Sequence, residues 1–190
     1  MPWDPARPIF ESGMVGIGTI RMAAGHSEMN RERVAYVWPT VSFQRLPYTV
    51  RFDRAELVQG DRNTAVLTSV GSVMRRVSLT DRGIDSVWMD VHPNLLADMV
   101  SVATQSTRDP DARFPWRSAP LPTAPLLAIP RLAVRLRKQG GALAGSSPPY
   151  PFASAAAGAP TPLEVEETVL GAIGAAVKSA AAARAPTRRR

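Results

Sequence analysis

Alternation of apolar and polar residues dominates the chain from about residue 33 to residue 91. In "TVSFQR", Val41 and Phe43 alternate with polar neighbours, and "YTVRF" places Tyr48, Val50 and Phe52 on one face. A period of two is typical of half-buried strands. Turn residues separate the short strands, so the pattern predicts an antiparallel barrel or sandwich.

The segment "DSVWMDV" alternates too and assigns its side chains to two faces. One face carries Val87, Met89 and Val91, and the other carries Ser86, Trp88 and Asp90.

After residue 92 the apolar positions take a helical period. "HPNLLADMVSVAT" has Pro93 at a favourable first helical position. A second helix is expected around Pro130, which should start, kink or divide it, and Gly140–Gly141 should end it. We therefore expect packing helices over residues 93–139.

Residues 140–160 are rich in Gly, Ser, Pro and Ala and predict a flexible linker. The last helix should begin at Thr161, with Pro162 in the first turn and Glu164 completing a capping box. Residues 161–190 thus form a linker or dimerisation helix with a basic tail. Its wide apolar band must be covered by the preceding helix, by the barrel or by a second chain, and we expect an antiparallel homodimer.

The formal charge of +7 resides in the second half of the chain. Residues 1–100 carry eleven Arg and eleven Asp or Glu, whereas residues 101–190 carry twelve Arg or Lys and five acids. A phosphate-contacting stripe of Arg131, Arg135, Arg137 and Lys138 is one interpretation, and a solvated helix face is the one we favour. A free-standing DNA binder of this kind would bind weakly, without sequence preference, and less tightly as salt rises.

The chain of 190 residues has no cysteine, which excludes disulfides and thiolate chemistry. Its start does not resemble a secretion signal, and no apolar run approaches a membrane span. We expect one cytoplasmic domain with appendages and no membrane contact.

Catalytic motifs are missing from the sequence. His26 and His92 are the two histidines and stand far apart, too few for a metal-binding barrel. No Gly-x-Ser-x-Gly elbow is found, and Gly16 and Gly18 lack the third glycine of a dinucleotide fingerprint. We predict no catalytic residue, no metal, no cofactor and no enzymatic activity.

Aromatic residues on the predicted strands are either core or the wall of a cavity. Four of them are our predicted ligand-binding residues, because a barrel that binds a small molecule needs mostly apolar walls. They are Trp38, Phe43, Tyr48 and Trp88.

A family resemblance joins these observations. "DRNTAVLTSVGSVMRRVSL" and "DRGIDSVWMDVHPNLLADMV" resemble the N-terminal effector-sensing domain of AraC/XylS-type transcriptional regulators. Asp61, Asn63 and Gly71 match the family's first turn elements, and Trp88 and Pro93 belong to its last strand and following helix. The similarity spans residues 33–178. Departures include Arg62 for the usual Pro, Ser69-Val70 for Asn-Arg and Ile84 for Asp.

The resemblance implies an α+β fold, with an antiparallel cupin-like β-barrel in residues 1–92 followed by C-terminal helices. It also implies a small-molecule-sensing and dimerisation module that responds to an unknown effector. Family members contact DNA through two helix-turn-helix units, for which this chain has no room after its final helix, so it would be a truncated regulator. The alternatives are a cupin-like enzyme and a free-standing ligand-binding protein.

Overall fold

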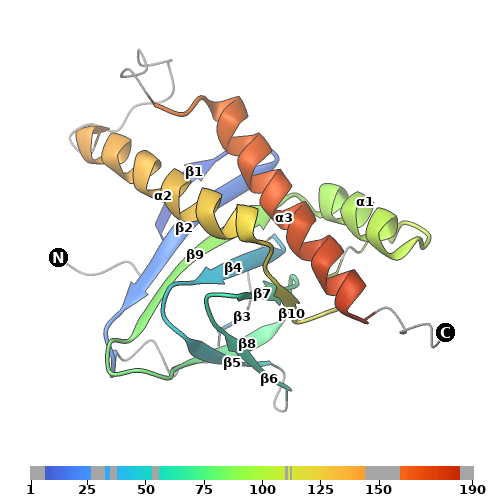
Figure 1. Cartoon of the computed structure of the whole chain (residues 1–190), viewed down its shortest axis with the longest axis horizontal. Coiled ribbons are helices and arrows are strands. Elements are labelled where there is room, and N and C mark those ends of the chain that lie inside the picture. Colours follow the sequence, from blue (N-terminus) through green and yellow to red (C-terminus); the bar gives the residue numbers. More distant parts are fainter. Residues whose placement is uncertain are drawn as a thin grey trace.

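Two antiparallel sheets with helices on one side make up the computed structural model of the chain (Figure 1). It describes residues 7–26, 33–34, 38–52, 56–109, 111, 113–143 and 159–184. The strands are β1 (Arg7–Glu11), β2 (Val15–Met22), β3 (Arg33–Val34), β4 (Thr40–Gln44), β5 (Tyr48–Phe52), β6 (Glu56–Gly60), β7 (Thr64–Thr68), β8 (Val73–Ser78), β9 (Ile84–Val91) and β10 (Ser118–Pro120). The helices are α1 (Pro93–Thr104), α2 (Thr123–Leu143) and α3 (Pro162–Arg184).

The larger sheet has the order β1-β2-β9-β4-β7-β10, and the smaller one has the order β3-β8-β5-β6. Every strand pairing given by the register is antiparallel. This arrangement confirms the predicted α+β class, an antiparallel β part followed by helices. The described strands form two sheets rather than one continuous barrel wall.

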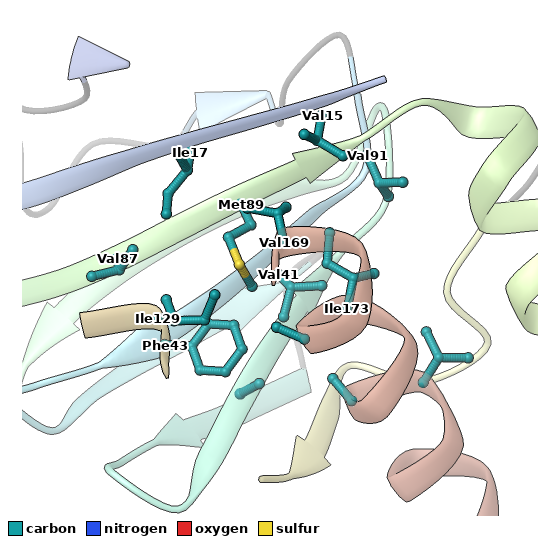
Figure 2. Close-up of a cluster of buried hydrophobic side chains, with 14 of the residues drawn as sticks. Val15, Ile17, Val41, Phe43, Val87, Met89, Val91, Ile129, Val169 and Ile173 are labelled. Atoms are coloured by element: carbon teal, nitrogen blue, oxygen red, sulfur yellow. The ribbon is translucent and has the colours of Figure 1, made fainter. Parts of the chain in front are cut away.

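The larger sheet separates two hydrophobic clusters. One cluster lies between the two sheets. The other lies between the larger sheet and the helices, where Val41, Phe43 and Met89 point toward Val169 and Ile173 of α3 (Figure 2). The sheet therefore has two buried faces, and β2, β7 and β9 contribute residues to both clusters.

Seven residues of α3 are buried, which answers the question of what covers its apolar band. They are Val165, Val169, Ala172, Ile173, Ala176, Val177 and Ala180. The sheet together with α1 and α2 covers this side of the helix within the same chain. The dimer remains a prediction, and the apolar band no longer requires it.

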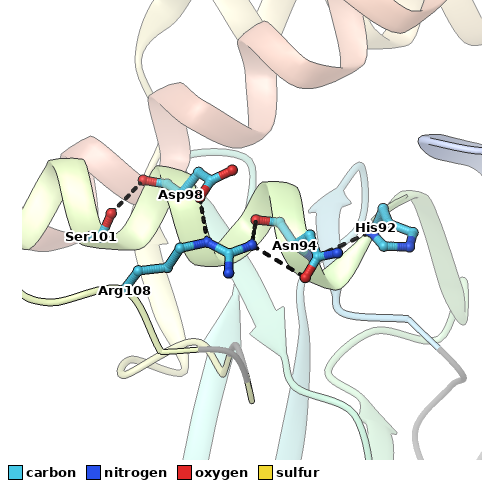
Figure 3. A network of polar contacts seen from close by, with 5 residues as sticks. All are labelled: His92, Asn94, Asp98, Ser101 and Arg108. Atoms are coloured by element: carbon cyan, nitrogen blue, oxygen red, sulfur yellow. Dashed lines mark hydrogen bonds and ion pairs between the residues drawn. The ribbon is translucent and has the colours of Figure 1, made fainter.

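Both predicted helix starts are confirmed. The hydroxyl of Thr161 accepts a hydrogen bond from the amide of Glu164 at 3.1 Å, which caps α3. Pro93 opens α1, and the ring Nδ1 of His92 accepts from the amide of Asn94 at 3.3 Å. Arg108 returns along α1 and bonds Asp98 at 2.6 Å (Figure 3). These contacts satisfy exposed helix-end groups and fix the loop that follows α1.

Three elements differ from the sequence prediction. Helix α2 runs on past Gly140–Gly141 to Leu143, because glycine weakens a helix without necessarily ending it, and Pro130, which was expected to start, kink or divide this helix, lies inside it. The short strand β10 was not predicted; it pairs with β7 and extends the larger sheet. Trp38 lies in a bend before β4 rather than on a strand.

The predicted linker falls mostly outside the described residues, as does the end of the basic tail. No helix in the described part of the chain is long and apolar enough to cross a membrane.

Candidate ligand site between the sheets

Ten buried apolar residues pack together between the two sheets. They are Ile20, Met22, Tyr48, Val50, Phe52, Val58, Val66, Met74, Ile84 and Trp88. Strand alternation brings them there from both sides, since side chains two residues apart share a face. The walls of small-molecule sites are mostly apolar in the same way.

Pairing between β4 and β9 adds polar groups to the same face. Ser42 stands opposite Trp88, and Gln44 stands opposite Ser86. Residues that face each other across two strands point to the same side of the sheet. Gln44, Ser86 and Trp88 therefore face the smaller sheet together, and all three are buried.

These three side chains hold buried polar atoms that have no hydrogen-bond partner among the described residues. They are Oε1 of Gln44, Oγ of Ser86 and Nε1 of Trp88. Gln44 satisfies its other end by donating from Nε2 to the carbonyl of Ser42 at 3.2 Å. Leaving such groups unpaired costs roughly 1–3 kcal/mol each. An amide oxygen, a hydroxyl and an indole N–H are thus available to a ligand that carries both hydrogen-bond donors and acceptors.

Gln44 reaches across the gap to the smaller sheet. A Cβ placed on Gly60 of β6 would lie 2.7 Å from Cγ of Gln44 and 2.9 Å from Cγ2 of Val66. Gly60 is therefore required for the close approach of the two sheets at this point.

A carboxylate lies farther along β9 on the same face. The hydroxyl of Thr40 donates to Oδ1 of Asp90 at 2.6 Å. Burial raises the pKa of Asp90 to about 6, the bond from Thr40 lowers it, and the charge of Glu11 raises it. Gly16 lies opposite Asp90 on β2, where a Cβ would be 3.7 Å from the Trp88 ring. Small residues on β2 thus leave room beside this acid and the indole.

The four predicted ligand-binding residues are divided by the fold. Tyr48 and Trp88 meet in the cluster between the sheets. Phe43 faces the helices on the opposite side of the larger sheet (Figure 2). Trp38 packs edge-on against His92, with ring centroids 5.5 Å apart. Ligand binding by these residues remains a prediction, and the structure groups only Tyr48 and Trp88.

The sequence pattern did not identify Gln44, Ser86 or Asp90 as ligand-binding residues. The signal was present, because Ser86 and Asp90 alternate on one face with Trp88, and the polar positions of "TVSFQ" also alternate. A polar face on a strand looks like a solvent face until the second sheet is known to cover it.

Metal ligands do not gather in the described residues, where no group of three or more His, Asp or Glu could hold an ion. His92 instead caps α1 and contacts Trp38.

No protein-family model matches the sequence, and no curated protein matches it. Among solved structures, the chain is similar to the AraC-like transcriptional activator CuxR, with a TM-score of 0.44 and 13% identity over 94% of this chain and 55% of that one. It is also similar to an RmlC-like cupin family protein from Methanocaldococcus jannaschii, with a TM-score of 0.39 and 10% identity over 45% and 77% of the two chains. ToxT from Vibrio cholerae gives 0.36 and 7% over 47% and 34%.

Proposed function

We propose that the chain is the small-molecule-sensing module of an AraC-type transcriptional regulator and holds its effector between the two sheets. The observation that carries the proposal is that polar atoms of Gln44, Ser86 and Trp88 lie within an apolar cluster and have no hydrogen-bond partner among the described residues. The motif resemblance of residues 33–178 supports the regulator class.

Strand β9 connects the proposed effector site with the helices, because it has side chains in both hydrophobic clusters. Trp88 faces the space between the sheets, whereas its neighbours Val87 and Met89 pack into the cluster shared with α2 and α3. A ligand that moves Trp88 therefore acts on the packing of Ile129 and Ile173 through one stretch of backbone. Because packed cores favour discrete arrangements, a small displacement can change which helix position is favoured.

The helices would pass this change to a second copy of the chain and to a helix-turn-helix domain that contacts DNA. In this proposal the module itself binds and does not catalyse. Elemental analysis of protein purified without chelators tests that point, since stoichiometric iron, manganese or zinc would favour the cupin-like enzyme instead.

A thermal-shift screen of small aromatic and polar metabolites tests the sensing function, because a ligand that binds only the folded state raises its melting temperature. For a hit, Trp88→Phe and Gln44→Leu should abolish most of the shift. Phe43→Leu is the matched control, since it alters the opposite face of the same sheet and should keep the shift. A hit whose shift is lost in Phe43→Leu and kept in Trp88→Phe would contradict the proposed site.

A further inference from the structure

Two arginines from separate parts of the chain pair with one carboxylate on the helix-facing side of the larger sheet, and a third lies beside them. Arg21 on β2 places Nη2 at 3.2 Å from Oδ2 of Asp85 on β9. Arg45 follows β4 and places Nη1 at 3.8 Å from the other carboxylate oxygen. Arg137 on α2 donates from Nη2 to the hydroxyl of Thr19 on β2. The cluster thus joins a helix to two strands and a loop.

Backbone contacts hold this cluster in place. Arg21 and Asp85 are direct partners in the pairing of β2 with β9. The amide of Arg45 donates to the carbonyl of Asp85 at 2.8 Å. The side chains therefore start from fixed positions, which lowers the conformational cost of gathering them around a ligand.

Positive charge exceeds negative charge here. Three guanidinium groups and one carboxylate leave a formal charge of +2 (three minus one) among the described members. Both oxygens of Asp85 are already paired, and within the described part of the chain Arg137 bonds the neutral hydroxyl of Thr19. Burial, followed by repulsion from Arg21 and Arg45, lowers the pKa of Arg137, while Asp85 opposes that change. An added anion would relieve this repulsion.

The guanidinium groups are also accessible. The side chain of Arg21 is 58% exposed and that of Arg45 is 27% exposed, whereas Asp85 is 17% exposed. Each guanidinium presents several N–H donors in a planar fork, and the contacts above use a few of them. Donors therefore remain open to solvent around a mostly covered carboxylate.

We propose that Arg21, Arg45 and Arg137 bind the phosphate group of a small phosphorylated metabolite. A phosphate monoester carries a charge of about −1.5 to −2 near neutral pH and matches the excess of the cluster, whereas a carboxylate matches only half of it. The planar guanidinium group of arginine can donate two parallel hydrogen bonds to a phosphate, and such bidentate charge-assisted bonds are stronger than bonds between neutral groups.

This site is separate from the one between the sheets. Thr19, Arg21 and Asp85 share the sheet face of Ile17 and Val87, opposite to that of Trp88. A bound phosphate would tie α2 to β2 and β9. Because Arg135 of the same helix pairs with Glu164 of α3 at 2.7 Å, this connection extends to α3. Phosphate binding at the cluster would thus be a second way to influence the position of the helices, besides a ligand between the sheets.

Calorimetric titration of the full chain tests the site, with glycerol phosphate and inorganic phosphate as separate probes at an ionic strength held constant with chloride. We expect one saturable site, and tighter binding of glycerol phosphate identifies an organic ester as the ligand type. Arg45→Gln and Arg137→Gln should each weaken binding by about tenfold or more. Arg131→Gln is the matched control, because it removes the same charge from an exposed position of α2 and should change binding by less than about twofold.

Thr19→Val keeps every charge and removes the hydroxyl that orients Arg137, so it should weaken binding while circular dichroism stays unchanged. Equal weakening by Arg131→Gln and Arg137→Gln would reveal general charge attraction and overturn the site. Binding that survives both Arg45→Gln and Arg137→Gln would overturn it too. So would displacement of glycerol phosphate by a short DNA duplex that binds more tightly, which would make the surface a nucleic-acid contact.

Discussion

Phe43 and Trp88 lie on neighbouring strands of one sheet and face opposite sides of it. The reason is their register, in which Trp88 pairs with Ser42 and Phe43 pairs with Val87. Phe43 is 4% exposed among residues of α2 and α3, while Trp88 is 6% exposed among residues of the smaller sheet. The two aromatics therefore have separate roles, one in attaching the helices and one in the space between the sheets.

Phe43→Ala should destabilise the protein by about 3–5 kcal/mol, because it leaves a cavity between the sheet and the helices. Urea unfolding followed by circular dichroism measures the change. Leu57→Ala on β6 is the control, since Leu57 is 60% exposed and its loss should cost less than about 0.5 kcal/mol. Similar losses in both variants would contradict the assignment of Phe43 to the core.

Much of the fold could be predicted from local patterns. The alternation of "DSVWMDV" indicated both faces of β9, and the caps at Thr161 and Pro93 indicated two helix starts. These features depend on neighbours within a few residues. The three-residue strand β10 carries no such pattern, and it exists because β7 offers an unpaired edge.

The site was harder to predict, because alternation separates two faces and does not say what covers each. On β4 the apolar face of Val41 and Phe43 turns toward the helices. The polar face of Ser42 and Gln44 turns toward the smaller sheet and is buried as well. Only the pairing of strands distant in sequence decides this, which is why Phe43 was grouped with Trp88.

Gly83 should tolerate no side chain. Its φ is +83°, and a Cβ there would lie 1.9 Å from the carbonyl oxygen of Met22. Gly83→Ala places a Cβ on a left-handed backbone and against the backbone of Met22, so we expect the free energy of unfolding to fall by more than about 3 kcal/mol.

Gly71→Ala is the matched control for that substitution. Gly71 has a φ of +76°, and no atom of the described residues lies within 4 Å of a Cβ built on it. The expected loss of stability is therefore only the cost of holding a residue with a Cβ in the left-handed region, about 1–2 kcal/mol. Thermal unfolding of both variants measures the difference, and equal losses would show that the close contact with Met22 is not rigid.

Asp90 should make stability depend on pH. Because its folded pKa of about 6 lies above the ordinary 3.8, the folded state binds more protons than the unfolded state between those values. Its contribution to the free energy of unfolding therefore falls as pH rises through this window. Asp90→Asn removes this pH dependence. As pH rises from about 4 to about 7, the free energy of unfolding of the variant should therefore increase relative to that of the wild type by on the order of 2 kcal/mol.

Thr40→Val provides a second measurement at the same acid. The Thr40 hydroxyl stabilises the carboxylate and lowers the pKa of Asp90, so its removal should move the titration midpoint upward. Carbon-detected NMR titration of the Asp90 carboxyl reports that midpoint in each protein. An unchanged or lower midpoint in Thr40→Val would mean that the hydrogen bond does not act on the ionised form.

Association through the helix layer is the last prediction. Since α3 buries seven residues within its own chain, a version ending at Gly158 would lose part of the core and could not separate dimerisation from folding. Apolar side chains that remain exposed on the helices are better targets, namely Leu127 and Val134 on α2 and Leu163 on α3. The ion pair of Arg135 with Glu164 brings α2 and the start of α3 together, so Leu127, Val134 and Leu163 are candidates for one shared surface.

We expect the intact chain to sediment as a dimer at high micromolar concentration. The double variant Val134→Glu, Leu163→Glu should sediment as a monomer with its helix content unchanged. Val102→Glu is the control, because Val102 is 70% exposed on α1, and it should leave the dimer intact. A monomeric wild type would end the dimer hypothesis, and a dimer that persists in the double variant would move the interface elsewhere.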